Sequence, residues 1–302
     1  MHQPVLLQSV ITGLDLRPGL TVVDGTINGG GHSVEIAKRI TGGHLIGLDQ
    51  DATAIANGRA RLAAVPCRVT LRVVNFRQLD QVLSSLGVTQ IDRLFLDLGF
   101  SSNQIQSAGR GFSFQTDEPL LMTYEVAPPP ERLTAGEIVN HWDEEKLAAC
   151  FQDYADEPFA RPIARAIVKA RQSAPLLTTG QLVEIIRQAV PRSYRAPNRR
   201  RHFATKVFQA LRLAVNDELA ALAEGLAKGF ASLAAGGRLA VITFHSGEAR
   251  VVKKFFQTVK VDGRGQIITR HAIKPTWPEI KTNPRARSAT LRIIQKNDDR
   301  KF

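Results

Sequence analysis

The sequence predicts an α/β fold in which a parallel sheet, with helices on both faces, is interrupted by a mostly helical insertion. Three observations lead to this prediction. Short β-type runs alternate with helical patterns over the first hundred residues, strand-like runs stop at about residue 107, and the alternation resumes near residue 203. We therefore expect one domain formed by residues 1–106 and 203–302, and a helical domain formed by residues 107–202.

Seven short apolar or β-branched runs bounded by turn residues predict the strands. They cover residues 20–24, 44–49, 69–74, 92–97, 238–244, 266–270 and 290–295. Amphipathic patterns predict helices over residues 32–40, 53–62 and 248–257, and one long helix over 205–233 that stops before Gly236-Gly237. Inside the insertion, helical periodicity occurs over residues 134–140, 144–154, 161–171 and 179–189.

The composition narrows the class of protein. With 43% hydrophobic residues the chain can form a core, and its 40 Lys and Arg against 28 Asp and Glu give a net charge of +12, which favours polyanionic partners. There is no signal peptide pattern and no apolar run of about 18 residues, so we expect a cytoplasmic protein without membrane association. Cys67 and Cys150 lie in no CxxC pattern, which predicts reduced thiols and no metal site.

A glycine-rich turn follows the first strand. Asp24 ends that strand, and residues 25–31 read GTINGGG. Glycines allow a ligand to approach the backbone closely, and the carboxyl edge of an open α/β sheet is where ligands bind. Asp49 closes the second strand, where a carboxylate can accept hydrogen bonds from ribose hydroxyls. Because the turn has neither a GK[ST] ending nor strict GxGxxG spacing, both NAD and S-adenosylmethionine remain open as the nucleoside cofactor.

Further polar groups follow the fourth and fifth strands. Asp97 ends the fourth strand, with Ser101, Ser102 and Gln104 close behind, and His245 follows the fifth. Such acceptors at one sheet edge can orient an amino group and receive its proton. A self-satisfied polar turn and a structural histidine are the competing interpretations.

Basic residues are concentrated in the second half of the insertion. Between Pro158 and Phe203 there are ten Lys or Arg residues and one acidic residue, Glu184. The candidates for binding the phosphates of a nucleic acid are Arg161, Arg165 and Lys169 at i, i+4, i+8 spacing, Arg195, Arg199, Arg200 and Arg201 in one loop, and Arg285 and Arg287 near the C-terminus. A solvated helix face is the alternative for some of them.

Several long segments resemble the bacterial 16S ribosomal RNA cytosine-N4 methyltransferase family. They include HQPVLLQSV, DGTINGGGHS, LDLGFSSNQ, FQALRLAVNDEL, GGRLAVITFHSGEAR and NPRARSATLRI, and they span nearly the whole chain. The resemblance implies a Rossmann-like S-adenosylmethionine-dependent methyltransferase sheet with an inserted helical domain. It also implies S-adenosylmethionine as the donor and a decoding-region cytosine of 16S rRNA, in the small ribosomal subunit, as the acceptor. Both a monomer and a homodimer remain open.

The resemblance also implies roles for individual residues. Cofactor contacts would come from Gly30, Gly31 and His32 in the loop, Asp49 at the ribose, Phe76 beside the adenine, and Asp97 and Gln104 near the methionine end. The candidate catalytic residues are Asp97, Ser101, Ser102 and His245.

The sequence departs from the family pattern in three places. Residues 118–125 read EPLLMTYE where the family has a segment of the type GPLDMRMD, FHSLEDR becomes FHSGEAR, and HPAT becomes HFAT with Phe203. The alternative hypothesis is therefore a relative that binds RNA and cofactor but has impaired or altered methyl transfer. A nicotinamide-dependent dehydrogenase is disfavoured by the imperfect GxGxxG and by the seven-strand pattern.

Overall fold

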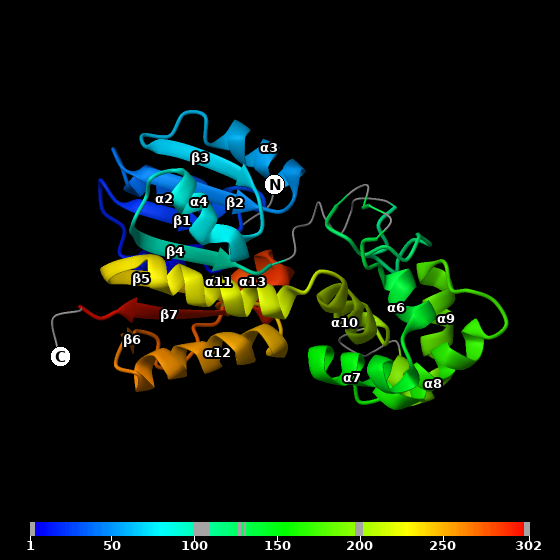
Figure 1. The fold of residues 1–302 in the computed structure, drawn as a ribbon. Coiled ribbons are helices and arrows are strands. Elements are labelled where there is room, and N and C mark those ends of the chain that lie inside the picture. Colours follow the sequence, from blue (N-terminus) through cyan, green and yellow to red (C-terminus); the bar gives the residue numbers. More distant parts are fainter. Residues whose placement is uncertain (1–3, 100–108, 126–127, 130, 197–201, 299–302) are drawn as a thin grey trace. The chain divides into compact units, whose positions relative to one another are not determined.

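The structure is a computed structural model that describes residues 4–99, 109–125, 128–129, 131–196 and 202–298. The chain forms two compact units (Figure 1). The first comprises Met1–Ser101 and Leu219–Phe302, and the second comprises Ser102–Glu218.

All seven predicted strands are present in one sheet of the first unit. They are β1 (Thr21–Asp24), β2 (His44–Asp49), β3 (Arg68–Val73), β4 (Ile91–Asp97), β5 (Leu233–Thr243), β6 (Gly265–Ile267) and β7 (Thr290–Lys296). Their order is β3-β2-β1-β4-β5-β7-β6, and only β7 runs antiparallel to its neighbours. The strand order reverses between β1 and β4, and such a switch point is where open α/β sheets bind ligands.

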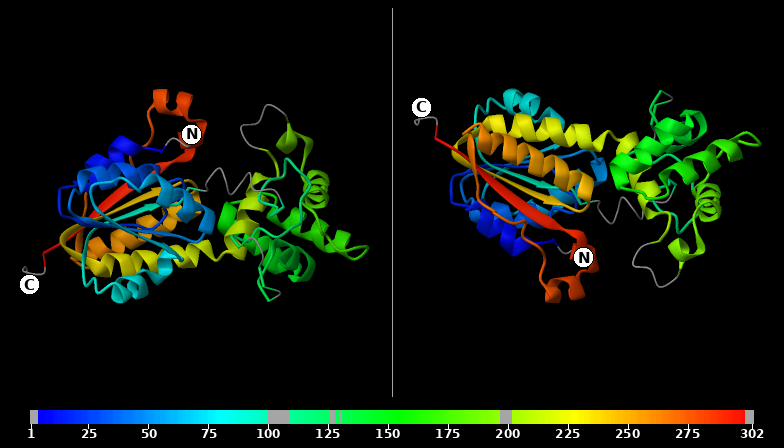
Figure 2. Two further views of the ribbon diagram at one scale, coloured as in Figure 1. Left: turned by 90° about the horizontal axis from the view of Figure 1, so that it is seen from above. Right: turned by 90° about the horizontal axis from the view of Figure 1, so that it is seen from below.

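Helices cover both faces of this sheet (Figure 2). One face carries α1 (Leu7–Leu14), α2 (Gly31–Arg39) and α3 (Ala52–Arg61); the other carries α4 (Leu79–Ser85), α11 (Glu218–Ser232) and α12 (Ser246–Val261). Successive side chains of the central strands β1, β2, β4 and β5 enter opposite cores; Val22, for example, joins the first and Val23 the second. These central strands are apolar on both sides, which is why their sequences read as nearly continuous hydrophobic runs, whereas the edge strand β3 is largely exposed.

The predicted long helix over 205–233 is wrong. The structure has two helices there, α10 (Thr205–Val215) and α11, separated by Asn216 and Asp217. Asp217 takes a left-handed conformation with φ of 49°, which Asp tolerates better than most residues. The Asn216 side chain donates to the carbonyls of Arg212 and Met122 and so ends α10. Gly236 and Gly237 lie within β5 and are not the stop signal of the helix.

The second unit is a helical bundle. It contains α6 (Ala135–His141), α7 (Glu144–Ala155), α8 (Ala160–Arg171), α9 (Thr179–Ala189) and the short η2 (Arg192–Arg195), together with α10. Because α10 packs on α6 and α7 and contributes Val207, Phe208 and Leu211 to their core, the boundary lies at residues 218–219 instead of 202–203. The sequence instead predicts residues 203–302, which include α10, as part of the sheet domain.

The unusual segment 118–125 is a well-packed part of this unit. Leu120 and Met122 are buried in its core, and Thr123 is fully buried with its hydroxyl donating to the Glu125 carbonyl. The Glu118 carboxylate accepts from the Gly111 amide and the Thr116 hydroxyl. Within this segment, the departures at Glu118 and Thr123 are therefore accommodated by local hydrogen bonds and packing.

Cys67 and Cys150 are both free, as predicted. None of the helices in the described ranges has the length and apolar character needed to cross a membrane.

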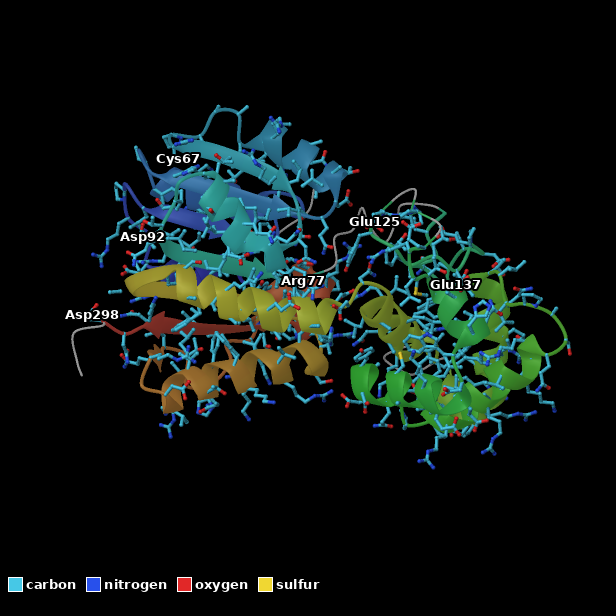
Figure 3. All side chains as sticks on the ribbon, in the orientation of Figure 1. Cys67, Arg77, Asp92, Glu125, Glu137 and Asp298 are labelled. Carbon is cyan, nitrogen blue, oxygen red and sulfur yellow. The ribbon has the colours of Figure 1, made fainter. Side chains whose placement is uncertain are left out.

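Short α4 and α13 (Trp277–Thr282) and the N-terminal α1 were not predicted. Arg77, labelled in Figure 3, attaches η1 (Phe76–Gln78) to α11 through an ion pair with Glu224, whose Nε–Oε2 distance is 3.0 Å.

Candidate functional site

Three buried carboxyl groups lie at the carboxyl edge of the sheet. Asp24, Asp49 and Asp97 are the last residues of β1, β2 and β4, which are neighbours in the sheet. Burial raises the pKa of all three, to about 6 for Asp49 and about 7 for Asp97, and the Glu248 charge adds to the rise at Asp97. Buried carboxyl groups with raised pKa values, clustered where the strand order of the sheet reverses, are typical of a functional site.

The loop after β1 holds these strand ends together through Asn28. Its backbone N–H donates to Asp49 Oδ2 at 2.8 Å, and its side-chain Nδ2 donates to the Asp97 carbonyl at 3.2 Å. The φ of Asn28 is 49°, in the left-handed region. Asn28 was missed from the sequence, although an Asn within a glycine-rich turn is a known signal for that conformation.

Gly30 and Gly31 form the junction between this loop and α2. Gly30 has a φ of +72°, which disfavours any side chain, and a Cβ on Gly31 would lie 2.5 Å from the Cγ of Pro4. Glycine is therefore favoured at position 30 by the backbone conformation and at position 31 by close packing against Pro4.

Asp49 retains acceptor capacity that fits an adenosine ribose. Its two oxygens accept one hydrogen bond each, from the N–H groups of Asn28 and Asp51. An ionised carboxylate offers about four acceptor sites, so about two remain for ribose hydroxyls. This buried carboxylate, beside a left-handed glycine loop, is chemically suited to S-adenosylmethionine.

His32 faces Asp97 in a buried pair. The His32 Nε2 lies 2.9 Å from the Val5 carbonyl, which can only accept, so Nε2 carries the proton. The other ring nitrogen, Nδ1, lies 3.5 Å from Asp97 Oδ2. Burial lowers the pKa of His32. A neutral Nδ1 and a carboxylate are both acceptors, so this pair is suited to hold one proton between them.

His245 forms the N-cap of α12. Its Nδ1 accepts from the Glu248 N–H at 3.3 Å, while the Glu248 carboxylate accepts from the N–H groups of Phe244 and His245. Its Nε2 lies 3.1 Å from Glu248 Oε1 without an aligned hydrogen bond. With Nδ1 occupied, His245 has a clear structural role, and its catalytic role stays a prediction.

The remaining predicted site residues are only partly placed. Phe76 is half-buried, and its Cβ packs near Gly25 while its ring packs near Gly225 of α11. Ser101, Ser102 and Gln104 lie outside the described residues, as do Arg199, Arg200 and Arg201. No cluster of three or more potential metal ligands occurs in the part of the chain that the structure describes.

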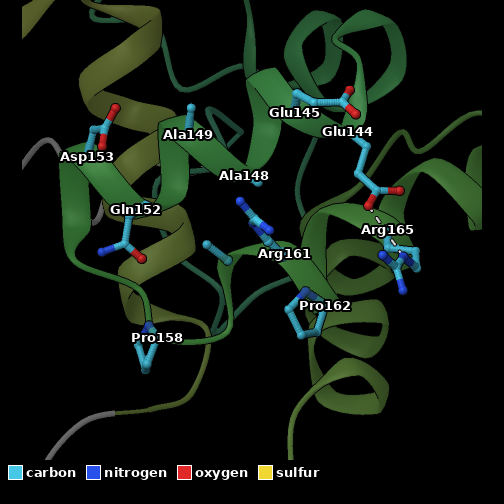
Figure 4. Close-up of a pocket in the computed structure, with 11 residues that line it drawn as sticks. Glu144, Glu145, Ala148, Ala149, Gln152, Asp153, Pro158, Arg161, Pro162 and Arg165 are labelled. Carbon is cyan, nitrogen blue, oxygen red and sulfur yellow. Dashed lines mark hydrogen bonds and ion pairs between the residues drawn. The ribbon is translucent and has the colours of Figure 1, made fainter.

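The basic candidates have different surroundings. Arg161, Arg165 and Lys169 are exposed on α8, as predicted, but Arg161 and Arg165 line a groove of about 700 Å³ together with Glu144, Glu145 and Asp153 of α7 (Figure 4). Arg165 Nε lies 3.3 Å from Glu144 Oε1. The positive charge of this helix face is thus partly compensated by α7.

Arg195 and the C-terminal candidates Arg285 and Arg287 lie on short 3-10 helices. Arg195 donates to the Arg187 carbonyl at 3.0 Å. Arg285 and Arg287 are exposed on the short helix η3 (Pro284–Ser288). These two are the exposed candidates that belong to the first unit, which also contains the buried acids.

Comparison with known proteins identifies the family to which the chain belongs. The MraW methylase family model matches residues 1–297. The Ribosomal RNA small subunit methyltransferase H of Symbiobacterium thermophilum is 44% identical, covering 98% of this chain and 96% of the relative. Its namesake from Limosilactobacillus fermentum is 42% identical, with 98% of each chain covered. A crystal structure of an rRNA methylase from Streptococcus thermophilus has a TM-score of 0.44 at 12% identity, covering 99% of both chains, a likeness too low to add to the assignment. The match over nearly the whole sequence shows that the chain belongs to the MraW methylase family.

Proposed function

We propose that this protein transfers a methyl group from S-adenosylmethionine to the N4 amino group of a cytosine in the decoding region of 16S rRNA, in the cytoplasm. The observation that carries the proposal is family membership over the full chain, including relatives named ribosomal RNA small subunit methyltransferase H. The buried acids at the switch point of the sheet support it independently.

The residues for the donor lie along the loop after β1 and the adjoining strand ends. Gly30 and Gly31 would let the backbone approach it, Asp49 would accept from the ribose, and Phe76 would cover the adenine. Asp97 and Gln104 would face the methionine end. When bound, S-adenosylmethionine supplies an electrophilic methyl group on a positively charged sulfur.

Asp97 is the residue that we assign to the acceptor amine. A cytosine amino group is weakly basic, and a hydrogen bond to a carboxylate increases its electron density and aims it. On transfer of the methyl group, one N–H proton of the amine would pass to the Asp97 carboxylate. His32, whose Nδ1 faces Oδ2, would stabilise that proton, so we assign it a positioning role rather than a direct cofactor contact.

The basic residues would bind the phosphates around the target. In the insertion these are Arg161, Arg165, Lys169, Arg195, Arg199, Arg200 and Arg201, and in the first unit they are Arg285 and Arg287. A stacked or paired cytosine hides its amine, so the base is expected to turn out of its stack into the site. Ser101, Ser102 and His245 remain candidates for contacts to that base.

The test is methyl transfer to small ribosomal subunits that lack the native modification. Purified protein is incubated with methyl-labelled S-adenosylmethionine, the RNA is digested, and labelled nucleosides are identified by mass spectrometry. Labelled N4-methylcytidine is expected, and fully modified subunits serve as the control. Absence of label in a protein shown calorimetrically to bind the donor would overturn the proposal and favour the binding relative with impaired transfer.

A further inference from the structure

The chain between β6 and β7 makes an excursion, residues 268–289, that emerges at the carboxyl edge of the sheet. It contains α13 and η3 and re-enters the sheet at Thr290. Thr290 pairs with Thr243 at the end of β5, and the preceding residue, Ile242, pairs with Asp97. The excursion is therefore attached to the edge that holds the buried acids.

Helix α13 is fastened beside His32. Glu279 Oε1 accepts from the Leu6 N–H at 2.6 Å, and the carbonyl of the adjacent Val5 accepts from His32 Nε2. The Glu279 charge also acts on the pKa of His32, since it raises the value that burial lowers. Figure 2 shows this orange-red segment projecting from the sheet beside the N-terminus.

Trp277, the first residue of α13, is 71% exposed. The chain has two tryptophans, and the other, Trp142 in the second unit, is partly buried. A large indole left in water forgoes the free energy that burial would contribute, and its exposed ring is available for a base to stack on. The Lys281 ammonium lies over the ring, 5.5 Å from its centroid, so a base would stack on the opposite face of the indole with a cation close by for its phosphate.

The surface around Trp277 is strongly basic. Residues 270–287 contain five Lys or Arg residues and one acidic residue, Glu279, whose Oε1 accepts from Leu6. The five exposed cations are Arg270, Lys274, Lys281, Arg285 and Arg287. Within the described part of the chain, none of them forms an ion pair with a carboxylate.

We propose that the excursion is a platform for unpaired RNA, on which one base stacks on Trp277 while the adjoining phosphates contact the five cations. An aromatic ring amid a cationic surface is the pattern by which proteins hold single strands without reading their sequence. This rests on the proposed function and deepens it, because a nucleotide stacked here would flank the cytosine presented to Asp97. The same chemistry also fits an anionic bilayer surface, which the test separates.

The experiment uses the full chain with Trp142→Phe, which leaves Trp277 as the only indole. Its fluorescence is titrated with a single-stranded oligoribonucleotide, with a duplex of the same sequence, and with phosphatidylglycerol vesicles. Quenching by the single strand, weakened by salt, is expected. Stronger responses to the duplex or the vesicles than to the single strand would overturn the proposal.

Substitutions of Trp277 provide a second experiment. Trp277→Ala should weaken binding of unmodified small subunits about tenfold, and Trp277→Phe should retain most of it. Val261→Ala, which alters another highly exposed apolar side chain of the same unit, is the matched control and should change nothing. Donor binding should be equal in all variants. If the wild type methylates the subunits and Trp277→Ala binds them equally well, the platform is refuted while the proposed function stands.

Discussion

The substitution Asp97→Asn tests two properties of Asp97 separately, its effect on the stability of the protein and its role in methyl transfer. The Asn side chain has the same shape, and its Oδ1 can still accept from the Gly99 N–H as Asp97 Oδ1 does. Its Nδ2 can donate to His32 Nδ1, as a protonated Asp97 would. The variant therefore mimics the neutral acid and cannot accept a proton.

The size of the stability change follows from the pKa of Asp97, about 7 against an ordinary value of 3.8. Between these values the native protein keeps a proton that the unfolded chain has released, so the wild type loses stability as the pH rises through this window. From pH 5 to pH 7 this amounts to about 3 kcal/mol at about 1.4 kcal/mol per unit, and little is added above pH 7. The amide of the variant does not titrate, so the stability of the variant relative to wild type should increase by that amount.

Urea unfolding of both proteins at pH 5 and pH 8 measures the difference. We expect Asp97→Asn to gain about 3 kcal/mol relative to wild type at the higher pH. Methyl transfer should fall by about two orders of magnitude or more while donor binding stays within a few-fold. An equal stability difference at both pH values would refute the burial argument, and undiminished methyl transfer would refute the proton-acceptor role.

Four other perturbations test single elements of the site. Asp49→Asn should lower donor affinity about tenfold in calorimetry, since the amide offers one acceptor oxygen in place of two. Gly30→Ala and Gly42→Ala, at similar positive φ, should each cost about 1 kcal/mol in urea unfolding, and only the former should weaken donor binding. His245→Asn should preserve the α12 cap and methyl transfer, whereas His245→Ala should lose about 1 kcal/mol; a large loss of activity in His245→Asn would make the imidazole catalytic. The wild-type kcat/KM should rise with pH through about 7, as Asp97 ionises, and a flat profile would exclude this.

The sheet could be predicted from the sequence because its central strands are buried on both faces. Runs such as LTVVD and HLIGLD have no polar interruption, and the acid that ends each run marks the sheet edge where ligands bind. Periodicity was less informative where elements are short. The six residues of α13 and the seven of α4 are too few for a clear pattern, and the Asn216-Asp217 break lies within continuous helical periodicity.

Within the site, single residues could be predicted but not their partners. Asp49 and Asp97 end strands, so their place follows from the sequence. The link from Asn28 to both, and the contact of His32 with Val5, depend on how the loop turns in three dimensions. Likewise, His245 was considered for the substrate because nothing in its neighbourhood shows that Glu248 would complete a capping box with it. The exposure of Trp277 depends on tertiary packing that the sequence does not reveal.

The most direct test of the account is to map the methylated nucleotide in a single-turnover reaction. Unmodified small subunits are treated with wild-type protein or Asp97→Asn and labelled donor, and the RNA is cut with a base-specific nuclease and analysed by oligonucleotide mass spectrometry. We expect N4-methylcytidine in one decoding-region fragment with wild type and almost none with the variant. Label on another base or atom, or equal label with both proteins, would contradict it.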